Sequence, residues 1–117
     1  MIDVLSPILD DLEAFATVGD EWVSETDTFP YMTYEYTQDR LETRHNTELT
    51  LDLWVREEDS DNIEAMATEI KEALDRKKYN SEKVITWLYF STRRKVREEA
   101  PNIKRIRIIF DIFNYYI

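Results

Sequence analysis

Apolar residues near the start of the chain recur three or four positions apart, which is the spacing of an amphipathic helix. Ser6 is suited to cap this helix and Pro7 to begin it, because the N–H that proline lacks has no partner in the first turn. The pattern predicts a helix over about 6–16, with the apolar stripe Ile2, Leu5, Leu9, Leu12 and Phe15.

A second helical stripe is expected over about 61–78. Residues 59–62 (DSDN) are typical helix-capping side chains, and Glu64 is an acid in the first turn, where the helix dipole favours negative charge. Residues 76–78 place three basic side chains at the other end. The stripe consists of Ile63, Met66, Ala67, Ile70, Ala73 and Leu74.

Four runs are typical of β-strands. Residues 29–36 are rich in aromatic side chains and have Pro30 at their beginning, where proline is tolerated in a strand. Residues 46–57 alternate between apolar and polar side chains, and 84–92, with an extension to 97, and 103–116 complete the set. The buried faces of the second and fourth runs are expected to carry Leu49, Leu51, Leu53, Val55, Ile106, Ile108, Phe110 and Ile112.

Some positions do not fit a simple two-sided strand. Trp54 lies on the polar face of its run, and an exposed tryptophan there would mark a contact surface. From Ile108 onward both faces of the last run are apolar, which indicates a central strand covered on both sides or one with a face held for a partner. The charged residues 37–45 are expected to form a loop or a flexible hairpin tip.

The order of these elements is α-β-β-α-β-β. It predicts an α+β fold in which a mainly antiparallel four-stranded sheet has both helices packed on it. The 117 residues are expected to form a single domain, 1–117. Residues 17–28 are polar and acidic, with Gly19 expected to stop the first helix, and they are expected to form a flexible segment.

The composition restricts the chemistry. There is no cysteine, which excludes disulfides and thiolate sites, and the single glycine excludes the phosphate-binding loops that need several. His45 is the only histidine and is expected to be a surface residue. Asp59, Asp61 and Glu64 are better explained as helix-capping residues than as metal ligands. No enzymatic activity, cofactor or metal is therefore expected, although a site built from paired carboxylates with a metal stays open.

The charge is unevenly distributed along a chain of net charge −10. Residues 1–69 contain 19 acidic and three basic side chains, whereas residues 70–117 contain 12 basic and six acidic ones. Two copies could therefore meet through regions of opposite sign, or the two halves could pair within one monomer. No signal peptide and no run of about 18–20 apolar residues is present, so a soluble protein that does not enter a membrane is expected.

The basic side chains cluster around the turn between the last two runs. Arg93, Lys95 and Arg97 share one predicted strand face, Arg94 lies between them, and Lys104, Arg105 and Arg107 follow the turn. A hairpin would gather these charges towards its tip. Such a tip could contact nucleic-acid phosphates or an acidic patch on a neighbouring subunit, or could simply keep an edge hairpin soluble.

Three features together resemble the tail-terminator and tail-completion proteins of long-tailed bacteriophages. The first is the strand 29–35 that begins Phe-Pro-Tyr, and the second is the strand, loop and helix formed by 51–55, 59–60 and 63–74. The third is the basic pair at 93–94 with the segment 101–105 (PNIKR) before an aromatic-rich strand. These features span residues 29–116, and the acidic segment 17–28 departs from the family's pattern.

The resemblance implies a structural virion protein of the head–tail junction that is assembled in the host cytoplasm. Such proteins complete the tail tube and join it to the neck as rings, often of six subunits, so the implied partners are other copies, the tail tube protein and the neck or connector proteins. Non-specific contact with DNA inside the ring channel is a further expectation. The residues expected to contact other subunits or the tail are Arg93, Arg94, Lys95, Arg97, Lys104, Arg105, Arg107 and Trp54. The alternative is a small acidic cytoplasmic adaptor that binds a basic protein.

Overall fold

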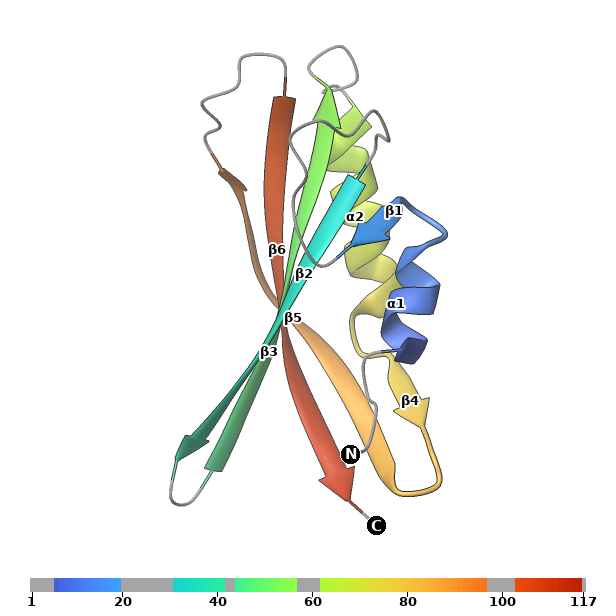
Figure 1. Ribbon diagram of the computed structural model, residues 1–117, viewed down its shortest axis with the longest axis vertical. Helices are drawn as coiled ribbons and strands as arrows, with labels where there is room; N and C mark the ends of the chain where they lie inside the picture. The colour runs from blue at the N-terminus through green and yellow to red at the C-terminus, as the bar shows by residue number, and fades with distance from the viewer. Residues whose placement is uncertain (1–5, 20–30, 42–43, 57–61, 97–102, 117) are drawn as a thin grey trace.

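A computed structural model describes residues 6–19, 31–41, 44–56, 62–96 and 103–116. Among these residues, each of two helices is followed by three strands along the chain (Figure 1). The helices are α1 (Ser6–Leu12) and α2 (Ile63–Leu74). The strands are β1 (Thr17–Gly19), β2 (Tyr31–Leu41), β3 (Arg44–Arg56), β4 (Lys78–Asn80), β5 (Val84–Val96) and β6 (Ile103–Tyr116).

The strands form one curled sheet in the order β1-β2-β3-β6-β5-β4, in which β1 and β2 are parallel and all other neighbours antiparallel. The prediction of a four-stranded sheet is therefore wrong, because β1 and β4 extend it at its two edges. Each of these strands has three residues, too few to show an alternating pattern in the sequence. Gly19 ends β1 rather than a helix, and a Cβ there would lie only 2.0 Å from the Tyr31 hydroxyl oxygen.

The ends of several elements also differ from the sequence-based prediction. The first helix ends at Leu12, and the second begins at Ile63, while residues 59–61 lie outside the described residues. The segment 37–45, expected to be a loop or hairpin tip, is mostly strand: β2 and β3 pair from Thr37 with Glu48 as far as Leu41 with Arg44. The hydrogen bonds between paired strands are made by backbone groups, which charged residues also have, so the charged sequence did not reveal this pairing.

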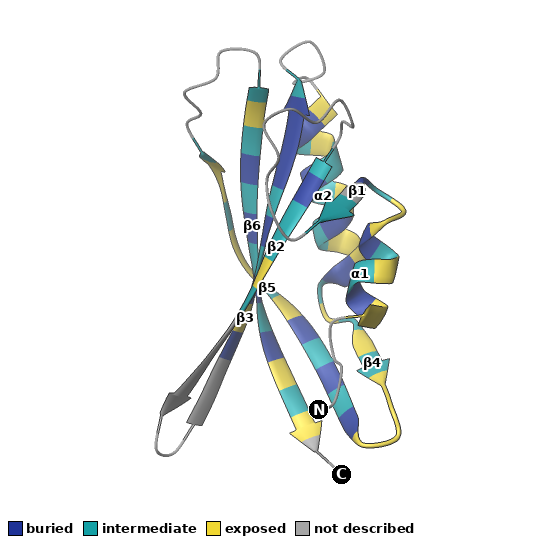
Figure 2. Cartoon of the chain, in the orientation of Figure 1, coloured by how far each residue is buried: buried dark blue, intermediate teal, exposed yellow. Residues whose placement is uncertain are grey.

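Both helices pack on the same face of the sheet, and the core lies between them and the strands (Figures 1 and 2). This face is called the covered face below. The alternation predicted for β3 and β6 is confirmed, because the apolar residues assigned to their buried faces are all buried. The helices contribute Ile8, Leu12, Ile63, Ala67, Ile70 and Leu74. Burial of one such side chain stabilises the fold by roughly 1.5–3 kcal/mol.

A polar contact holds α1 against the edge of the sheet. The Asp11 carboxylate accepts hydrogen bonds from the Lys77 ammonium and, at 2.6 Å, from the Tyr79 hydroxyl on β4. The hydrogen bond from Lys77, with that from Tyr79, lowers the pKa of Asp11. Burial and the same contact with Asp11 raise the pKa of Tyr79, so its hydroxyl remains a donor. This contact joins segments 66 and 68 residues apart in the sequence.

Candidate interaction surface

The opposite side of the sheet is called the uncovered face, because no helix of the described residues lies on it. In antiparallel strands, directly paired residues have their side chains on the same face. Pairing therefore assigns Trp54 and Asp52 of β3 to the uncovered face, together with their partners Arg105 and Arg107 of β6. The aromatic residues Trp87, Tyr89, Phe113 and Tyr115 lie on the same face at its other end.

A β-bulge at Ser91 decides which basic residues of β5 face which side. Up to Phe90, which pairs with Phe110, the two strands are in simple register, but Thr92 rather than Ser91 pairs with Ile109. One inserted residue exchanges the two faces for every side chain that follows. Arg93 and Lys95 consequently lie on the covered face, and Arg94 lies on the uncovered face beside Arg107.

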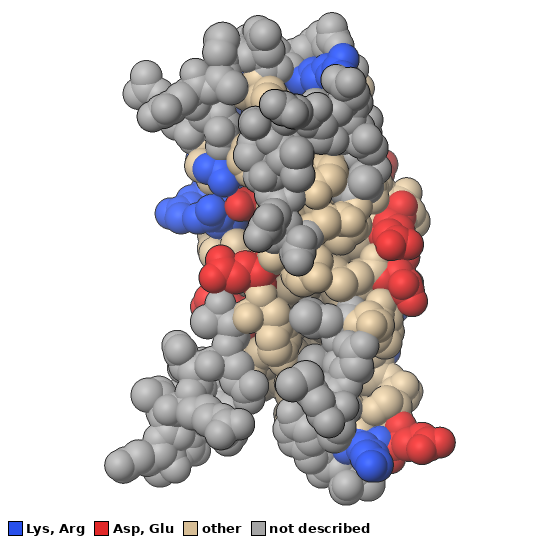
Figure 3. Space-filling view, in the orientation of Figure 1, with Lys and Arg blue, Asp and Glu red and all other residues tan. Residues whose placement is uncertain are grey.

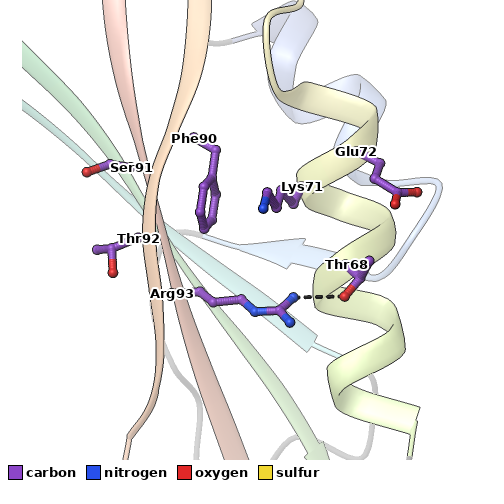
Figure 4. A pocket seen from close by; sticks show the side chains of 7 residues that line it. All are labelled: Thr68, Lys71, Glu72, Phe90, Ser91, Thr92 and Arg93. Carbon is purple, nitrogen blue, oxygen red and sulfur yellow. Dashed lines mark hydrogen bonds between the residues drawn. The ribbon is translucent and has the colours of Figure 1, made fainter.

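On the covered face, Arg93 and Lys95 contact α2. Arg93 donates a hydrogen bond of 2.9 Å to the Thr68 hydroxyl, and both basic side chains lie 3.6 Å from the Glu64 carboxylate. The Lys71 ammonium lies 4.3 Å from the centre of the Phe90 ring. These side chains border a shallow groove of about 570 Å³ between α2 and β5, lined by Thr68, Lys71, Glu72, Phe90, Ser91, Thr92 and Arg93 (Figure 4).

On the uncovered face, one carboxylate organises two arginines. Asp52 accepts hydrogen bonds from Arg107 at 2.9 and 3.3 Å and from Arg105 at 3.3 Å. The hydrogen bond to Asp52 raises the pKa of Arg107, so this arginine keeps its charge. The Arg105 guanidinium lies 4.5 Å from the centre of the Trp54 ring, a cation–π contact. Asp52 therefore holds both arginines in place, while their side chains stay partly exposed to solvent.

Trp54 is not the exposed tryptophan that the sequence predicted. Its side chain is only 5% exposed, and its indole N–H donates a 3.3 Å hydrogen bond to Thr33. It lies on the polar face as predicted, but Arg105 of the neighbouring strand covers its ring. The sequence could not show this, because the covering residue is 51 positions away and is brought next to Trp54 only by the pairing of β3 with β6.

The aromatic end of the uncovered face is the feature that the sequence-based list of contact residues missed. Tyr89, Phe113 and Tyr115 are 39%, 49% and 60% exposed. Tyr89 stacks with Trp87 at 6.4 Å between ring centres and meets Phe113 edge-on at 5.5 Å. The available signal was the apolar character of both faces of the last strand. Exposed aromatic side chains in contact with one another are typical of protein interaction surfaces.

The basic residues predicted as contacts therefore do not form one patch. Arg94, Arg105 and Arg107 lie on the uncovered face, whereas Arg93, Lys95 and Lys104 pair with covered-face residues of the neighbouring strands. Arg97 lies outside the described residues. Charges of both signs also occur on one flank of the molecule: Figure 3 shows acidic side chains along the flank of α1, and on the opposite flank a group of basic side chains with acidic ones next to it.

The described residues contain no group of three acidic or histidine side chains placed to hold a metal ion. Asp59 and Asp61 lie outside the part of the chain that the structure describes, as does the side chain of His45. Neither described helix has the length and apolar content needed to cross a bilayer.

Comparison with known proteins identifies the family. Residues 9–114 match the family model of the tail completion protein gp17. The chain belongs to the tail completion protein gp17 family. The resemblance seen in the sequence is thereby confirmed, and the tail completion chain is a structural component of a bacteriophage-type virion.

The fold of this tail completion chain is also found in a solved virion structure. One chain of a structure described as "Virion of native gene transfer agent (GTA) particle" is similar to it, with a TM-score of 0.62 and 15% sequence identity. The match covers 94% of this chain and 85% of that chain. At this identity the likeness concerns the fold. The search among curated proteins gave no match.

Proposed function

We propose that this tail completion chain closes the end of the tail tube and joins it to the neck by assembling into a ring. Family membership supports a role in the tail and contact with other virion proteins. The ring, the position at the head–tail junction, and contacts with the tail tube and neck proteins are the proposed part. A ring of about six copies, as the resemblance implies, would surround a channel in which basic side chains meet DNA without sequence preference.

The observation that carries the proposal is the uncovered face. An antiparallel sheet can have one solvated face, but such a face is normally polar. Here it ends in three aromatic side chains that are between 39% and 60% exposed, two of which, Tyr89 and Phe113, contact each other. A second surface that covers this patch would remove apolar area from water, which favours association by about 25 cal/mol per Å² before the costs of association are subtracted.

The charges supply a possible complement in a head-to-tail arrangement. Such a ring needs two different, matching surfaces on each subunit. The uncovered face carries Arg94, Arg105 and Arg107 at one end, and it also carries the acids Asp52, Glu48 and Asp111. The helical side of the sheet carries the exposed acids Asp10, Glu69 and Glu72 on the helices and Glu13 directly after α1. In the proposed arrangement, the uncovered face of one subunit meets the helical side of the next.

The test is size exclusion coupled to light scattering at low salt and at about 0.5 M salt, where exposed charge pairs are screened. We expect a mass several times 14.1 kDa that falls as the salt concentration rises. Tyr115→Glu places a charge in the aromatic patch and should give monomers. The matched variant Tyr115→Phe keeps the aromatic side chain and should assemble like the wild type.

A second measurement tests the case in which the oligomeric ring assembles only on the tail. Purified tails that lack this protein are incubated with the wild type and the two variants, and bound protein is counted by quantitative gel analysis. We expect several copies of the wild type and of Tyr115→Phe per tail, and few of Tyr115→Glu. A protein that is monomeric at every salt concentration and also fails to bind tails would contradict the proposal. Retention of a basic host protein instead would support the adaptor alternative.

A further inference from the structure

The outer edge of β5 changes character along its length. β4 pairs with β5 only at Ile85, Thr86 and Trp87. The backbone N–H and C=O of Leu88, which follow on the same outer edge, are also hydrogen-bonded: the N–H donates to Lys77 and the C=O accepts from Arg76. The Phe90 N–H then donates to the Asp75 carboxylate at 2.8 Å. Within the described residues, no strand or side chain pairs with the outer backbone edge from Ser91 to Val96.

This free edge is about 20 Å long, at roughly 3.3 Å per residue. Its inner side is fixed by pairing with β6 as far as Val96, so the edge is held extended. The helix α2 runs beside it, and the groove between them is lined by Thr68, Lys71, Phe90 and Arg93 (Figure 4). An unpaired edge beside a helix is the geometry in which an extended peptide adds to a sheet as a further strand.

The side chains around the edge indicate the charge of such a strand. Lys71, Arg93 and Lys95 lie on the groove side, and Arg94 lies on the opposite face of the same strand. Glu64 partly offsets two of these charges, and Lys95 is still 78% exposed. Glu72 also lines the groove, at the end of its lining on α2, so two acids stand against the four basic side chains. The edge is thus locally basic in a chain of net charge −10.

Basic side chains can also protect a free edge from pairing by lying across its backbone. In this protein, contacts with other side chains hold Arg93 and Lys71 in place. Arg93 is bonded to Thr68 and lies near Glu64, and Lys71 lies over the Phe90 ring. Thr68 and Glu64 hold Arg93 toward α2, and Lys71 reaches from α2 to the Phe90 ring of β5, so both cations line the groove. The bulge at Ser91 is what turns Arg93 and Lys95 toward the helix.

We propose that the edge Ser91–Val96 and the adjoining groove bind an extended, acidic strand of another protein by β-strand addition. Backbone hydrogen bonds would hold the strand in line with β5, and its carboxylates would meet Lys71, Arg93 and Lys95. The other long edge in the described residues, β2 beyond Thr33, has a single acid, Glu35, among its described side chains, against the three cations Lys71, Arg93 and Lys95. Charge complementarity therefore favours a different protein over a second copy. The site is separate from the aromatic patch, so either proposal can fail alone.

The experiment uses three short synthetic peptides of equal length, each labelled for fluorescence anisotropy. One alternates glutamate with valine, the second alternates lysine with valine, and the third is the glutamate peptide with N-methyl groups at alternate backbone nitrogens. The glutamate peptide should bind, and its methylated form should bind at least about tenfold more weakly, because methylation removes the N–H donors that a sheet requires. The lysine peptide should not bind. Amide exchange at 91–96 should slow in the complex.

Three variants locate the site, with circular dichroism as a check of folding. Lys71→Glu and Arg93→Ala should each weaken binding of the glutamate peptide by about tenfold, since each removes charge from the groove. Arg94→Ala is the matched control: it removes one charge from the same strand on the opposite face and should change binding by less than about twofold. If Arg93→Ala does not fold, the binding measured for Lys71→Glu tests the site by itself.

Several outcomes would overturn the proposal. Equal binding of the methylated and unmethylated glutamate peptides would mean that charge acts without strand pairing. Duplex DNA that protects the 91–96 amides while the glutamate peptide does not would identify a phosphate-binding surface. Protection that rises with protein concentration alone would identify a second copy as the occupant. If no peptide binds at concentrations up to about 1 mM, the proposed binding site is ruled out.

Discussion

The covered and uncovered faces belong to the same strands but are built from different side chains. On the covered face, aliphatic residues and Phe110 are fully or almost fully buried against α1 and α2. On the uncovered face, an aspartate, two arginines and a tryptophan contact one another at one end, and aromatic side chains remain exposed at the other. One face holds the fold together, and the other leaves apolar and charged groups available to a partner.

β6 shows the difference over a distance of three residues. Phe110 is fully buried on the covered face and meets Phe90 edge-on at 6.1 Å, whereas Phe113 on the uncovered face is 49% exposed. The same residue type is therefore a core residue at one position and a surface residue at the other. The helices make this difference, because the backbone of the strand is equivalent at both positions.

The largest expected effect comes from testing this pair directly. Phe110→Ala should lower the free energy of unfolding by about 4 kcal/mol, since it removes a fully buried ring and leaves a cavity. Phe113→Ala should lower it by only about 1 kcal/mol, because the lost contact is a half-exposed edge-on pair with Tyr89. Urea unfolding measures both. Equal losses would show that the uncovered face is as important for stability as the core.

An intermediate effect is expected for the carboxylate of the uncovered face. Asp52→Ala leaves Arg105 and Arg107 without their shared acceptor and should destabilise the fold by about 2 kcal/mol, the scale of hydrogen bonds to charged groups. Glu48→Ala is the control, because Glu48 is an exposed acid on the same face of the same strand. It should change stability by less than about 0.5 kcal/mol. If both variants behave alike, the arginine contacts contribute nothing to the fold.

The smallest effect concerns the contact that ties α1 to the edge of the sheet, and it depends on pH. The pKa of Asp11 is below its ordinary value of 3.8 in the folded protein. Its contribution is therefore present above that value and is lost as the pH falls through the lowered folded pKa. At pH 7, Asp11→Asn should cost less than about 1 kcal/mol, because the pair with Lys77 is partly exposed.

Measurements of stability at low pH test the prediction for Asp11. Thermal unfolding of the wild type and Asp11→Asn should converge toward pH 2, because the wild-type carboxyl is then protonated as well. Asp10→Asn is the matched control, since Asp10 is the exposed neighbour on the same helix. It should follow the wild type at every pH. A stability difference for Asp11→Asn that is the same at pH 2 and pH 7 would point to altered packing rather than charge.

The amino-acid sequence by itself determined the two helices, the four long strands and the inward residues of β3 and β6. These follow from local periodicity: Leu49, Leu51 and Leu53 must share a face in any extended strand. The sequence also indicated the family, because the pattern of strands and helix recurs there.

Only the tertiary structure decided the width of the sheet and the surroundings of the candidate contact residues. The strands β1 and β4 are too short for periodicity, and they exist because longer neighbours offer them an edge. Arg105 of the adjacent strand lies over the ring of the buried Trp54, and Arg93 faces α2 because one bulge at Ser91 shifts the register. Each of these depends on contacts between segments distant in the sequence, and local pattern carries no information about which segments will meet.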